Sequence, residues 1–378
     1  MTIQMVDLRR QYAAIQTEID DILLDTVRSG SFINGPQVHA FSDHLAAYTD
    51  IEHVIPCANG TDALQLALMA LDLQAGDEVI VPAFTYVATA EVIGLLHLVP
   101  VMVEVDPYTF NLRVEEVRAA ITPRTRAVIP VHLFGQSTDM EPLLALAEAN
   151  DLYVVEDNAQ SIGAVYTFDN GQQSFTGGMG HIGTTSFYPS KNLGAYGDGG
   201  ALFTRSAELA DRLRALANHG QTGRRYYHDL IGVNSRLDSL QAAILDVKLG
   251  HLNTYIAARQ AAAAHYDTAL ADLPQLTCPQ RVPYSTHVFH QYTMRVAPAH
   301  RDALRAHLQR CGVPTMLYYP VPLYRQAAYR AYWNGAEFPV TEALCASVLS
   351  LPMHTELTPA MLKHITDSIQ SYFSTATA

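Results

Sequence analysis

Residues 184–200 read Thr-Thr-Ser-Phe-Tyr-Pro-Ser-Lys-Asn-Leu-Gly-Ala-Tyr-Gly-Asp-Gly-Gly. The stretch opens as a short apolar strand, turns at Pro189 and closes in a cluster of glycines. Between the two turns it presents Lys191, in a chain that carries only 24 Lys and Arg residues. A lysine held in such a turn, with few charges nearby, is a candidate nucleophile because its pKa can be lowered there. A solvated surface lysine is the alternative, and residues upstream decide between the two.

Length and charge narrow the class of protein. The chain has 378 residues, 49% of them hydrophobic, which is enough for two domains or for one large domain with a smaller one. Only 16% of the residues are charged, so we expect other subunits to cover part of the surface. The net charge of −13 and the lack of a basic stripe argue against nucleic acid as a partner. An anionic small molecule remains possible, because a local pocket can be basic.

The cysteines and the termini indicate no special compartment. Four cysteines stand far apart and form no Cys-x-x-Cys pair, so we expect neither a metal site nor a disulfide framework. The N-terminus has no apolar signal core, and the longest apolar run, 92–103, is too short for a membrane span. We therefore expect a cytoplasmic protein without a membrane partner.

Between residues 53 and 157, short apolar runs alternate with helical patterns. The expected strands are 53–58, 77–82, 99–105, 127–134 and 153–157, and the expected helices are 61–71, 85–96, 114–121 and 140–149. This alternation predicts a mainly parallel sheet with helices on both faces, whose ligands lie at the carboxyl ends of the strands.

The flanking segments complete the expected organisation. One amphipathic helix is expected at 11–29, and a second ends near residue 48. A long Ala-rich helix, 238–268, is followed by mixed strands and helices. We expect a large domain at 1–238, and a linking helix with a small domain at 239–378.

Three strand ends carry groups that can hold a cofactor. Asn59-Gly60-Thr61 opens a helix, and free N–H groups there form a phosphate cradle, although an ordinary helix cap has the same sequence. Asp157 ends an apolar strand and can pair with a protonated ring nitrogen or cap a helix. Tyr86 can stack on a flat cofactor or pack in the core.

A dinucleotide site is not supported. Residues 178–183 match Gly-x-Gly-x-x-Gly, but no strand precedes them and a strand, not a helix, follows. The other groups form a specific set instead, with Lys191 placed 34 positions after Asp157. A lysine for a Schiff base, an aspartate for a pyridine nitrogen and a helix start for a phosphate are the requirements of pyridoxal 5'-phosphate.

At these residues the chain resembles the DegT-type sugar-nucleotide aminotransferases, which are fold type I pyridoxal-phosphate enzymes. The resemblance runs from 6–8 to 351–354 and is carried by residues 57–65, 82–89, 156–161, 186–191 and 232–238. It implies an α/β fold with a mainly parallel central sheet, helices on both faces and a smaller C-terminal α/β domain. It also implies a homodimer whose subunits share their active sites.

The resemblance assigns roles to individual residues. It makes Lys191 and Asp157 the catalytic pair, with Lys191 as the Schiff-base lysine and Asp157 on the pyridine nitrogen. The other residues that it places at the cofactor are Gly60, Thr61 and Ser186 on the phosphate, Tyr86 and Gln160 on the ring, and Asn234 on the phosphate of the neighbouring subunit's cofactor. The residues that it places at the substrate are Arg236, Arg224, Arg225, Tyr318 and Tyr319.

Within that family, the chain is most similar to enzymes that aminate C3 of UDP-2-acetamido-2-deoxy-3-keto-glucuronate. The resemblance implies glutamate as amino donor and a role in surface polysaccharide (lipopolysaccharide) biosynthesis. Arginines are plausible counter-charges for a uronate with a diphosphate. Tyr318 stands where this subgroup usually has histidine, so a 3-keto sugar without the carboxylate, or a 4-keto-6-deoxy sugar, remains an alternative. A non-catalytic regulator or sensor is the alternative of another class.

Overall fold

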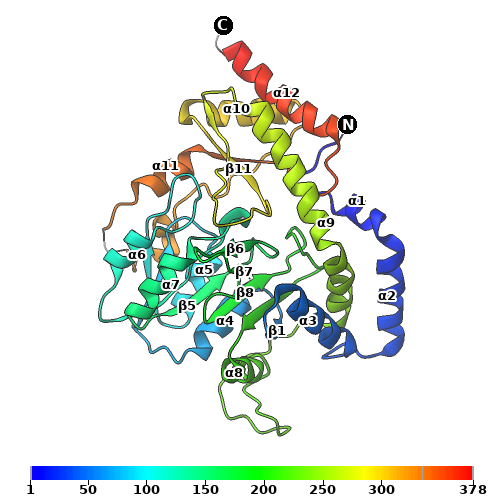
Figure 1. Ribbon diagram of the computed structural model, residues 1–378, viewed down its shortest axis with the longest axis vertical. Coiled ribbons are helices and arrows are strands. Elements are labelled where there is room, and N and C mark those ends of the chain that lie inside the picture. The colour runs from blue at the N-terminus through cyan, green and yellow to red at the C-terminus, as the bar shows by residue number, and fades with distance from the viewer. Residues whose placement is uncertain (1, 334, 377–378) are drawn as a thin grey trace.

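A seven-stranded sheet forms the centre of the computed structural model, which describes residues 2–333 and 335–376 (Figure 1). The strands lie in the order β1 (His53–Cys57), β9 (Gly200–Thr204), β8 (Ile182–Ser186), β5 (Tyr153–Asp157), β4 (Thr125–Val128), β2 (Glu78–Pro82) and β3 (Val99–Val103). Strand β9 runs antiparallel to both of its neighbours, and every other pair is linked in the parallel sense. The predicted, mainly parallel sheet is confirmed.

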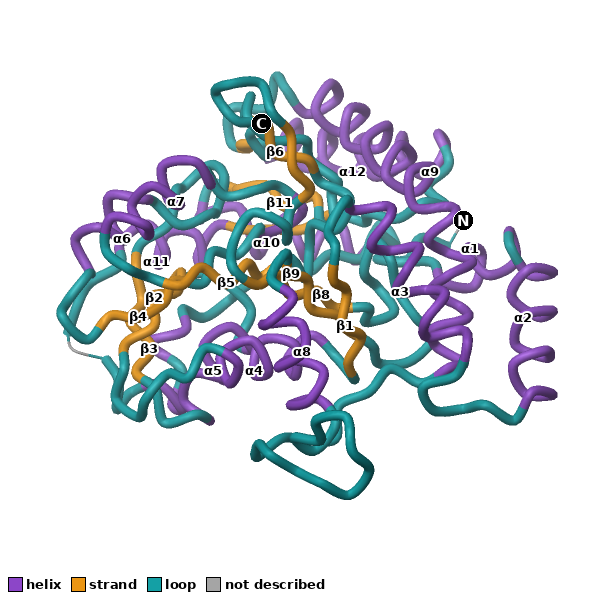
Figure 2. The backbone as a smooth tube through the Cα atoms, turned by 60° about the horizontal axis from the view of Figure 1, so that its bottom comes forward, coloured by secondary structure: helices purple, strands orange, loops and turns teal. Residues whose placement is uncertain are grey.

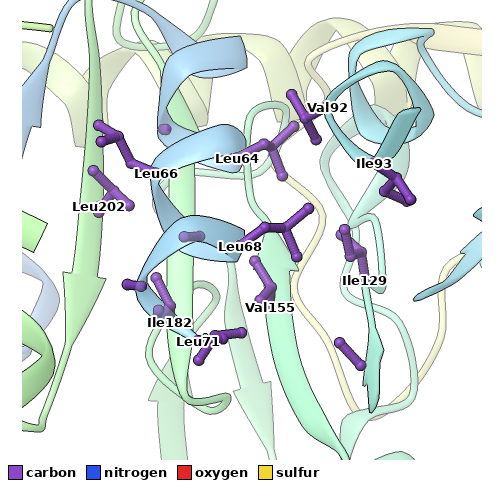
Figure 3. Close-up of a cluster of buried hydrophobic side chains, with 14 of the residues drawn as sticks. Leu64, Leu66, Leu68, Leu71, Val92, Ile93, Ile129, Val155, Ile182 and Leu202 are labelled. Atoms are coloured by element: carbon purple, nitrogen blue, oxygen red, sulfur yellow. The ribbon is translucent and has the colours of Figure 1, made fainter. Parts of the chain in front are cut away.

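Helices cover both faces of this sheet, as the alternation predicts (Figure 2). The helices on one face are α4 (Gly60–Ala70), α5 (Ala88–Leu95) and α8 (Ala207–Ala217). The helices on the other face are α3 (Pro36–Thr49), α6 (Val114–Ala120), α7 (Met140–Ala149) and α9 (Ser239–Leu270). Leu64 and Leu68 of α4 lie in one buried cluster with Val155 and Ile182 of the sheet (Figure 3). Because side chains alternate along a strand, the neighbouring Val154 enters the core of the opposite face.

Three expected elements differ most from the observed limits, and the others differ by at most two residues. The helix expected at 11–29 is two helices, α1 (Leu8–Ala14) and α2 (Gln16–Ser29), because Ile15 leaves the helical conformation at φ −125° and ψ 22°. The strand expected at 127–134 ends at Val128, and the last residues of the expected strand lie in the 3-10 turn η1 (Leu133–Gly135), where Phe134 has a positive φ of 59°. The helix expected at 85–96 begins only at Ala88, which leaves Tyr86 in a loop.

The C-terminal part forms a second core. A three-stranded antiparallel sheet, β10 (Leu276–Thr277), β11 (Tyr292–Val296) and β12 (Val348–Leu351), packs with α10 (Pro298–Arg310) and α12 (Pro359–Ala376). A short helix, α11 (Pro339–Ser347), precedes β12, and a two-stranded sheet, β6 (Val165–Thr167) and β7 (Gln173–Phe175), flanks the large core.

The long helix α9 belongs to both cores. Ala242 and Leu252 lie in the core around β1 and β9, whereas Tyr266 and Leu270 lie in the second core. The division of the chain into two domains at residue 238 therefore stays a prediction. Across the described ranges, no helix has the length and apolar character needed to span a membrane.

Candidate active site

A cavity of about 610 Å³ opens at the carboxyl ends of β2, β5 and β8, beside the start of α4. This is the edge at which ligands bind to parallel sheets. The residues predicted for the cofactor or substrate that line it are Gly60, Thr61, Tyr86, Asp157, Gln160, Ser186, Lys191, Tyr318 and Tyr319. The structure thus brings together most of the predicted site in one chain.

The turn that holds Lys191 is built as the sequence predicts. Pro189 follows β8, and the backbone N–H of Lys191 donates to the carbonyl of Tyr188 at 2.8 Å. The next residue, Asn192, is buried and donates its side-chain amide to the carbonyl of Val288 at 2.9 Å. Burial lowers the pKa of the Lys191 amine to about 8, although the charge of Asp157 opposes this effect. About a tenth of the amine is therefore uncharged at pH 7, far more than for an ordinary lysine, and this form is the nucleophile.

Asp157 lies at the end of β5 with 5% of its surface exposed. Its carboxylate accepts hydrogen bonds from the Thr89 hydroxyl at 2.9 Å and from the Ala159 backbone N–H at 3.1 Å. Burial raises the pKa of Asp157, and the bond from Thr89 is the largest effect in the opposite direction. Sequence reasoning missed Thr89. Its signal is its place at the end of residues 82–89, one of the stretches that carry the family resemblance.

The preceding residue, Glu156, points to the other side of the strand and is fully buried. Its carboxylate accepts three backbone N–H groups from residues 177, 179 and 180 at 2.6–2.8 Å. It also lies 2.9 Å from Nε2 of His132, whose Nδ1 accepts the Thr138 N–H. The glycine-rich segment that matches the dinucleotide fingerprint therefore cradles a carboxylate of its own chain, and the exclusion of a dinucleotide site is consistent with this geometry.

The start of α4 forms an open cradle. Asn59 caps the helix by accepting the Asp62 N–H at 2.8 Å, whereas the N–H groups of Gly60 and Thr61 meet no protein acceptor in the described chain. A Cβ at Gly60 would lie 2.7 Å from Cβ of Ser186, so only glycine lets these two segments approach. Free N–H groups beside a serine hydroxyl suit the oxygens of a phosphate.

Aromatic rings form the opposite wall. Tyr86 is 55% exposed at the cavity, so it is not a core residue, and its ring centroid lies 6.2 Å from that of Tyr319. Gln160 donates to the Tyr319 hydroxyl at 3.2 Å and accepts the Phe134 N–H at 2.9 Å. Tyr318 is half-buried at the same wall, and burial raises the pKa of its hydroxyl.

Two predicted substrate residues lie away from this cavity. Arg224 and Arg225 stand at the exposed tip of the loop that follows α8, which projects from the body of the molecule (Figures 1 and 2). Their guanidinium groups lie over the rings of Tyr227 and Tyr226, at 4.3 and 4.9 Å from the centroids. Within one chain they do not reach Lys191.

Arg236 and Asn234 are also not part of the cavity wall. Arg236 donates to Asn218 at 3.4 Å and lines a separate hollow of about 920 Å³, bordered by residues of α3 and α8. Asn234 is exposed on the same loop. A single chain therefore does not combine these two residues with the Lys191 cavity.

Sequence reasoning did not anticipate some residues of the wall. They are Leu64, Thr85, Ala88, Val131, Phe134, Ala159, Tyr188, Ser190, Asp198, His290 and Gln291. Tyr188 and Ser190 flank Lys191, so the turn itself indicates them. His290 and Gln291 come from the segment before β11, and no local pattern marks them.

These groups define a class of protein. A strand-end lysine and aspartate, an open helix start and an aromatic wall, on a mainly parallel sheet with a second α/β core, fit pyridoxal phosphate in a fold type I enzyme. The buried lysine, whose amine has its pKa lowered to about 8, the buried carboxylate and the Gly60 cradle are the observations that support this fit.

The chain belongs to the DegT/DnrJ/EryC1/StrS aminotransferase family, whose model matches residues 13–370. It is 46% identical to a UDP-2-acetamido-2-deoxy-3-oxo-D-glucuronate aminotransferase from Pseudomonas aeruginosa, over 96% of this chain and 98% of the relative. It is 44% identical to a UDP-N-acetyl-3-dehydro-alpha-D-glucosamine 3-aminotransferase from Acidithiobacillus ferrooxidans, over 97% of each chain. The solved structure of DesV from S. venezuelae, in complex with a ketimine intermediate, matches with a TM-score of 0.93 and 39% identity over 98% of each chain. The protein is therefore a pyridoxal-phosphate-dependent aminotransferase that acts on a keto sugar nucleotide.

Proposed function

We propose that the protein transfers the amino group of glutamate to C3 of UDP-2-acetamido-2-deoxy-3-keto-glucuronate, giving the 3-amino sugar nucleotide in the cytoplasm. The observation that carries the chemistry is the pairing, in one cavity, of a Lys191 amine with a pKa of about 8 and a buried Asp157 carboxylate. The sugar is proposed from the similarity to the P. aeruginosa enzyme along nearly the whole chain.

Each residue of the cavity has a role in this proposal. The cofactor, when bound, supplies an electron sink that makes a proton on the reacting carbon acidic. Lys191, whose amine is readily deprotonated, removes that proton and returns it to the new carbon. Asp157 holds a proton on the ring nitrogen, and Thr89 keeps its carboxylate oriented. Gly60 and Ser186 bind the phosphate, and Tyr86 covers the ring.

The substrate's charge favours a homodimer with shared sites. A uronate with a diphosphate carries several negative charges, yet among the described residues that line the cavity Lys191 is the only lysine or arginine. Arg236 and Asn234 lie on the loop after α8, part of which projects from the molecule. A second copy that places this loop at the cavity would supply the missing cation and a further donor for the phosphate.

One other substrate has specific support, namely the 3-keto sugar without the carboxylate. The A. ferrooxidans relative carries that substrate in its name and is almost as similar. Tyr318, in the position where the uronate subgroup usually has histidine, lines the cavity as an uncharged, half-buried group. A neutral sugar would need no further cation at C5.

A comparison of two sugars tests the proposal. The holoenzyme is first treated with glutamate, and its visible absorption should bleach as the amino group reaches the cofactor. The 3-keto uronate and its C6-hydroxymethyl counterpart are then added separately, and the return of absorption is followed. A charge-assisted hydrogen bond to the carboxylate contributes about 1.5–3 kcal/mol, so the uronate should react about 10- to 150-fold faster in kcat/KM.

The results test the sugar, the amino donor and the transamination reaction separately. Equal rates for the two sugars would show that the carboxylate is not recognised and would favour the neutral substrate. A holoenzyme that glutamate does not bleach, but another amino acid does, would contradict glutamate as donor. A protein that takes up the cofactor and responds to no amino donor would contradict transamination itself.

A further inference from the structure

His290 is a buried imidazole in the wall of the active-site cavity, and none of the roles above involves it. It lies in the segment that leads into β11, and 6% of its surface is exposed. Its Nε2 lies 3.4 Å from the side-chain nitrogen of Gln291. Its Nδ1 is buried and has no hydrogen-bond partner within residues 2–333 and 335–376. A buried polar atom without a partner is uncommon enough to need an explanation.

The contact with Gln291 fixes which nitrogen of His290 carries the proton. An amide NH₂ group can only donate, so Nε2 of His290 accepts. Burial, together with the charges of Lys191 and Arg259, lowers the pKa of His290 well below its ordinary value, so the ring is neutral. A neutral ring whose Nε2 accepts carries its proton on Nδ1. His290 therefore has an N–H donor without a partner in the described chain, and leaving such a buried donor unpaired is destabilising.

The backbone around His290 is held firmly with respect to Lys191. Arg259 is buried in α9 and donates through Nη1 to the carbonyls of Phe289 at 3.1 Å and of His290 at 3.3 Å. Asn192, the neighbour of Lys191, donates to the carbonyl of Val288 at 2.9 Å. These contacts fix the segment that carries the imidazole against both α9 and the Lys191 turn. A fixed donor binds with a smaller loss of conformational entropy than a mobile one.

The charges of the cavity indicate what this donor binds. Among the described lining residues, Lys191 is the only lysine or arginine, and Asp157 and Asp198 are the acids. An amino acid that donates its amino group brings its α-carboxylate close to Lys191. The bond between its α-carbon and the amino nitrogen must break there, and the same carbon carries the carboxylate. A neutral N–H donor can bind that carboxylate without adding a second positive charge beside the Lys191 amine.

We propose that His290 binds the amino donor: its Nδ1–H donates a hydrogen bond to a carboxylate oxygen of a dicarboxylic amino acid, or of the matching 2-oxo acid, beside Lys191. The proposal rests on the proposed function, in which glutamate is the donor. It assigns a binding role to the segment before β11, in addition to its structural role between the two cores.

Two variants of the holoenzyme test this role. His290→Leu removes the donor, whereas His290→Asn keeps an N–H group near the position of Nδ1. The probe is succinate, a dicarboxylate that cannot react, and its Kd is measured by calorimetry. Loss of a hydrogen bond to a charged group should weaken succinate binding about 10- to 150-fold in His290→Leu, and His290→Asn should restore most of it. The rate of bleaching by glutamate should follow the same order, and the sugar half-reaction should change less.

Controls separate this role from a structural one. Tm and bound cofactor are measured for each variant, since a purely structural role would lower both without a specific loss of succinate binding. If wild-type protein is bleached by glutamate and His290→Leu binds succinate equally well, the inference is wrong and the proposed function stands. If wild-type protein neither bleaches nor binds succinate, both are wrong.

A wild-type measurement covers the case in which His290→Leu does not fold. A crystal structure of the holoenzyme with succinate should place a carboxylate oxygen within hydrogen-bond distance of Nδ1 of His290. Succinate bound in the cavity without that contact would overturn the inference.

Discussion

The substitution Thr89→Val tests how much the Thr89 hydroxyl stabilises the Asp157 carboxylate. The side-chain hydroxyl of Thr89 is buried and donates to Oδ2 of Asp157 at 2.9 Å. Valine has nearly the same shape but no hydroxyl, so the substitution removes one of the two hydrogen bonds that the described chain gives this carboxylate. The Ala159 N–H remains, and so do the charges of Lys191 and His132, which also favour the ionised form.

The expected magnitude follows from the type of bond. A hydrogen bond to a charged group contributes about 1.5–3 kcal/mol, so the cofactor-free variant should lose about that much free energy of unfolding at neutral pH. The pKa of Asp157 already lies above its ordinary value of 3.8, and it should rise further. A carboxyl whose pKa is raised by folding loses stability as pH increases from the ordinary pKa to the folded one. The destabilisation should therefore be largest at neutral pH and shrink on acidification.

Thr89→Ser is the matched control. It keeps the hydroxyl and loses one buried methyl group, which should cost about 0.8 kcal/mol at every pH. Unfolding of both variants in denaturant, followed across the pH range in which the native state persists, gives the comparison. A Thr89→Val cost that equals that of Thr89→Ser, or that does not depend on pH, would refute the reasoning. In the holoenzyme, Thr89→Val should also lower kcat more than Thr89→Ser does.

Four further outcomes are expected. The rate at which cofactor-free protein gains visible absorption with pyridoxal phosphate should rise between about pH 7 and 9, because only the neutral Lys191 amine reacts and its pKa is about 8; a rise that continues to pH 10.5 would contradict this. Gly60→Ala should weaken cofactor binding measured by equilibrium dialysis, since its Cβ would meet Ser186 at 2.7 Å, and wild-type affinity would disprove the cradle. Gly250→Ala, in the interior of α9 with nothing within 4 Å of the new Cβ, should raise the free energy of unfolding by about 0.5–1 kcal/mol, which a denaturant titration measures. Mixing Lys191→Ala with Asn234→Ala protein should restore part of the activity through hybrids with one native site, and shared sites would be rejected if proven heterodimers stayed inactive.

The groups that were predictable from the sequence are those whose position follows from strand periodicity. Parallel strands bring their carboxyl ends to one edge, so Asp157 after β5 and Lys191 after β8 meet without any knowledge of side-chain packing. Gly60 joins them because α4 starts directly after β1. Five of the seven strands follow from the alternation and β8 from the stretch at 184–200, whereas the antiparallel β9 was not predicted.

Groups that come from distant segments could not be predicted in this way. His290 reaches the cavity because Arg259, in the middle of α9, binds the carbonyls beside it, and no sequence pattern links a helix residue to those carbonyls. The sequence also could not decide whether Tyr86 stacks on a cofactor or packs in the core. Tyr86 is exposed at the cavity, and its ring neighbour Tyr319 comes from the C-terminal part of the chain, which no local pattern brings there.

The glycine-rich segment shows why a motif needs its structural context. Its N–H groups turn inward to Glu156, one residue before the aspartate of the candidate site. Successive residues of a strand point to opposite faces, so Glu156 and Asp157 lie in different surroundings although they are adjacent in sequence. Glu156 links β5 to the loop before β8 on the side of the strand opposite to Asp157. Strand β8 then leads directly into the Lys191 turn. The same glycines that suggest a nucleotide site therefore help to hold the aspartate and the lysine at one edge of the sheet.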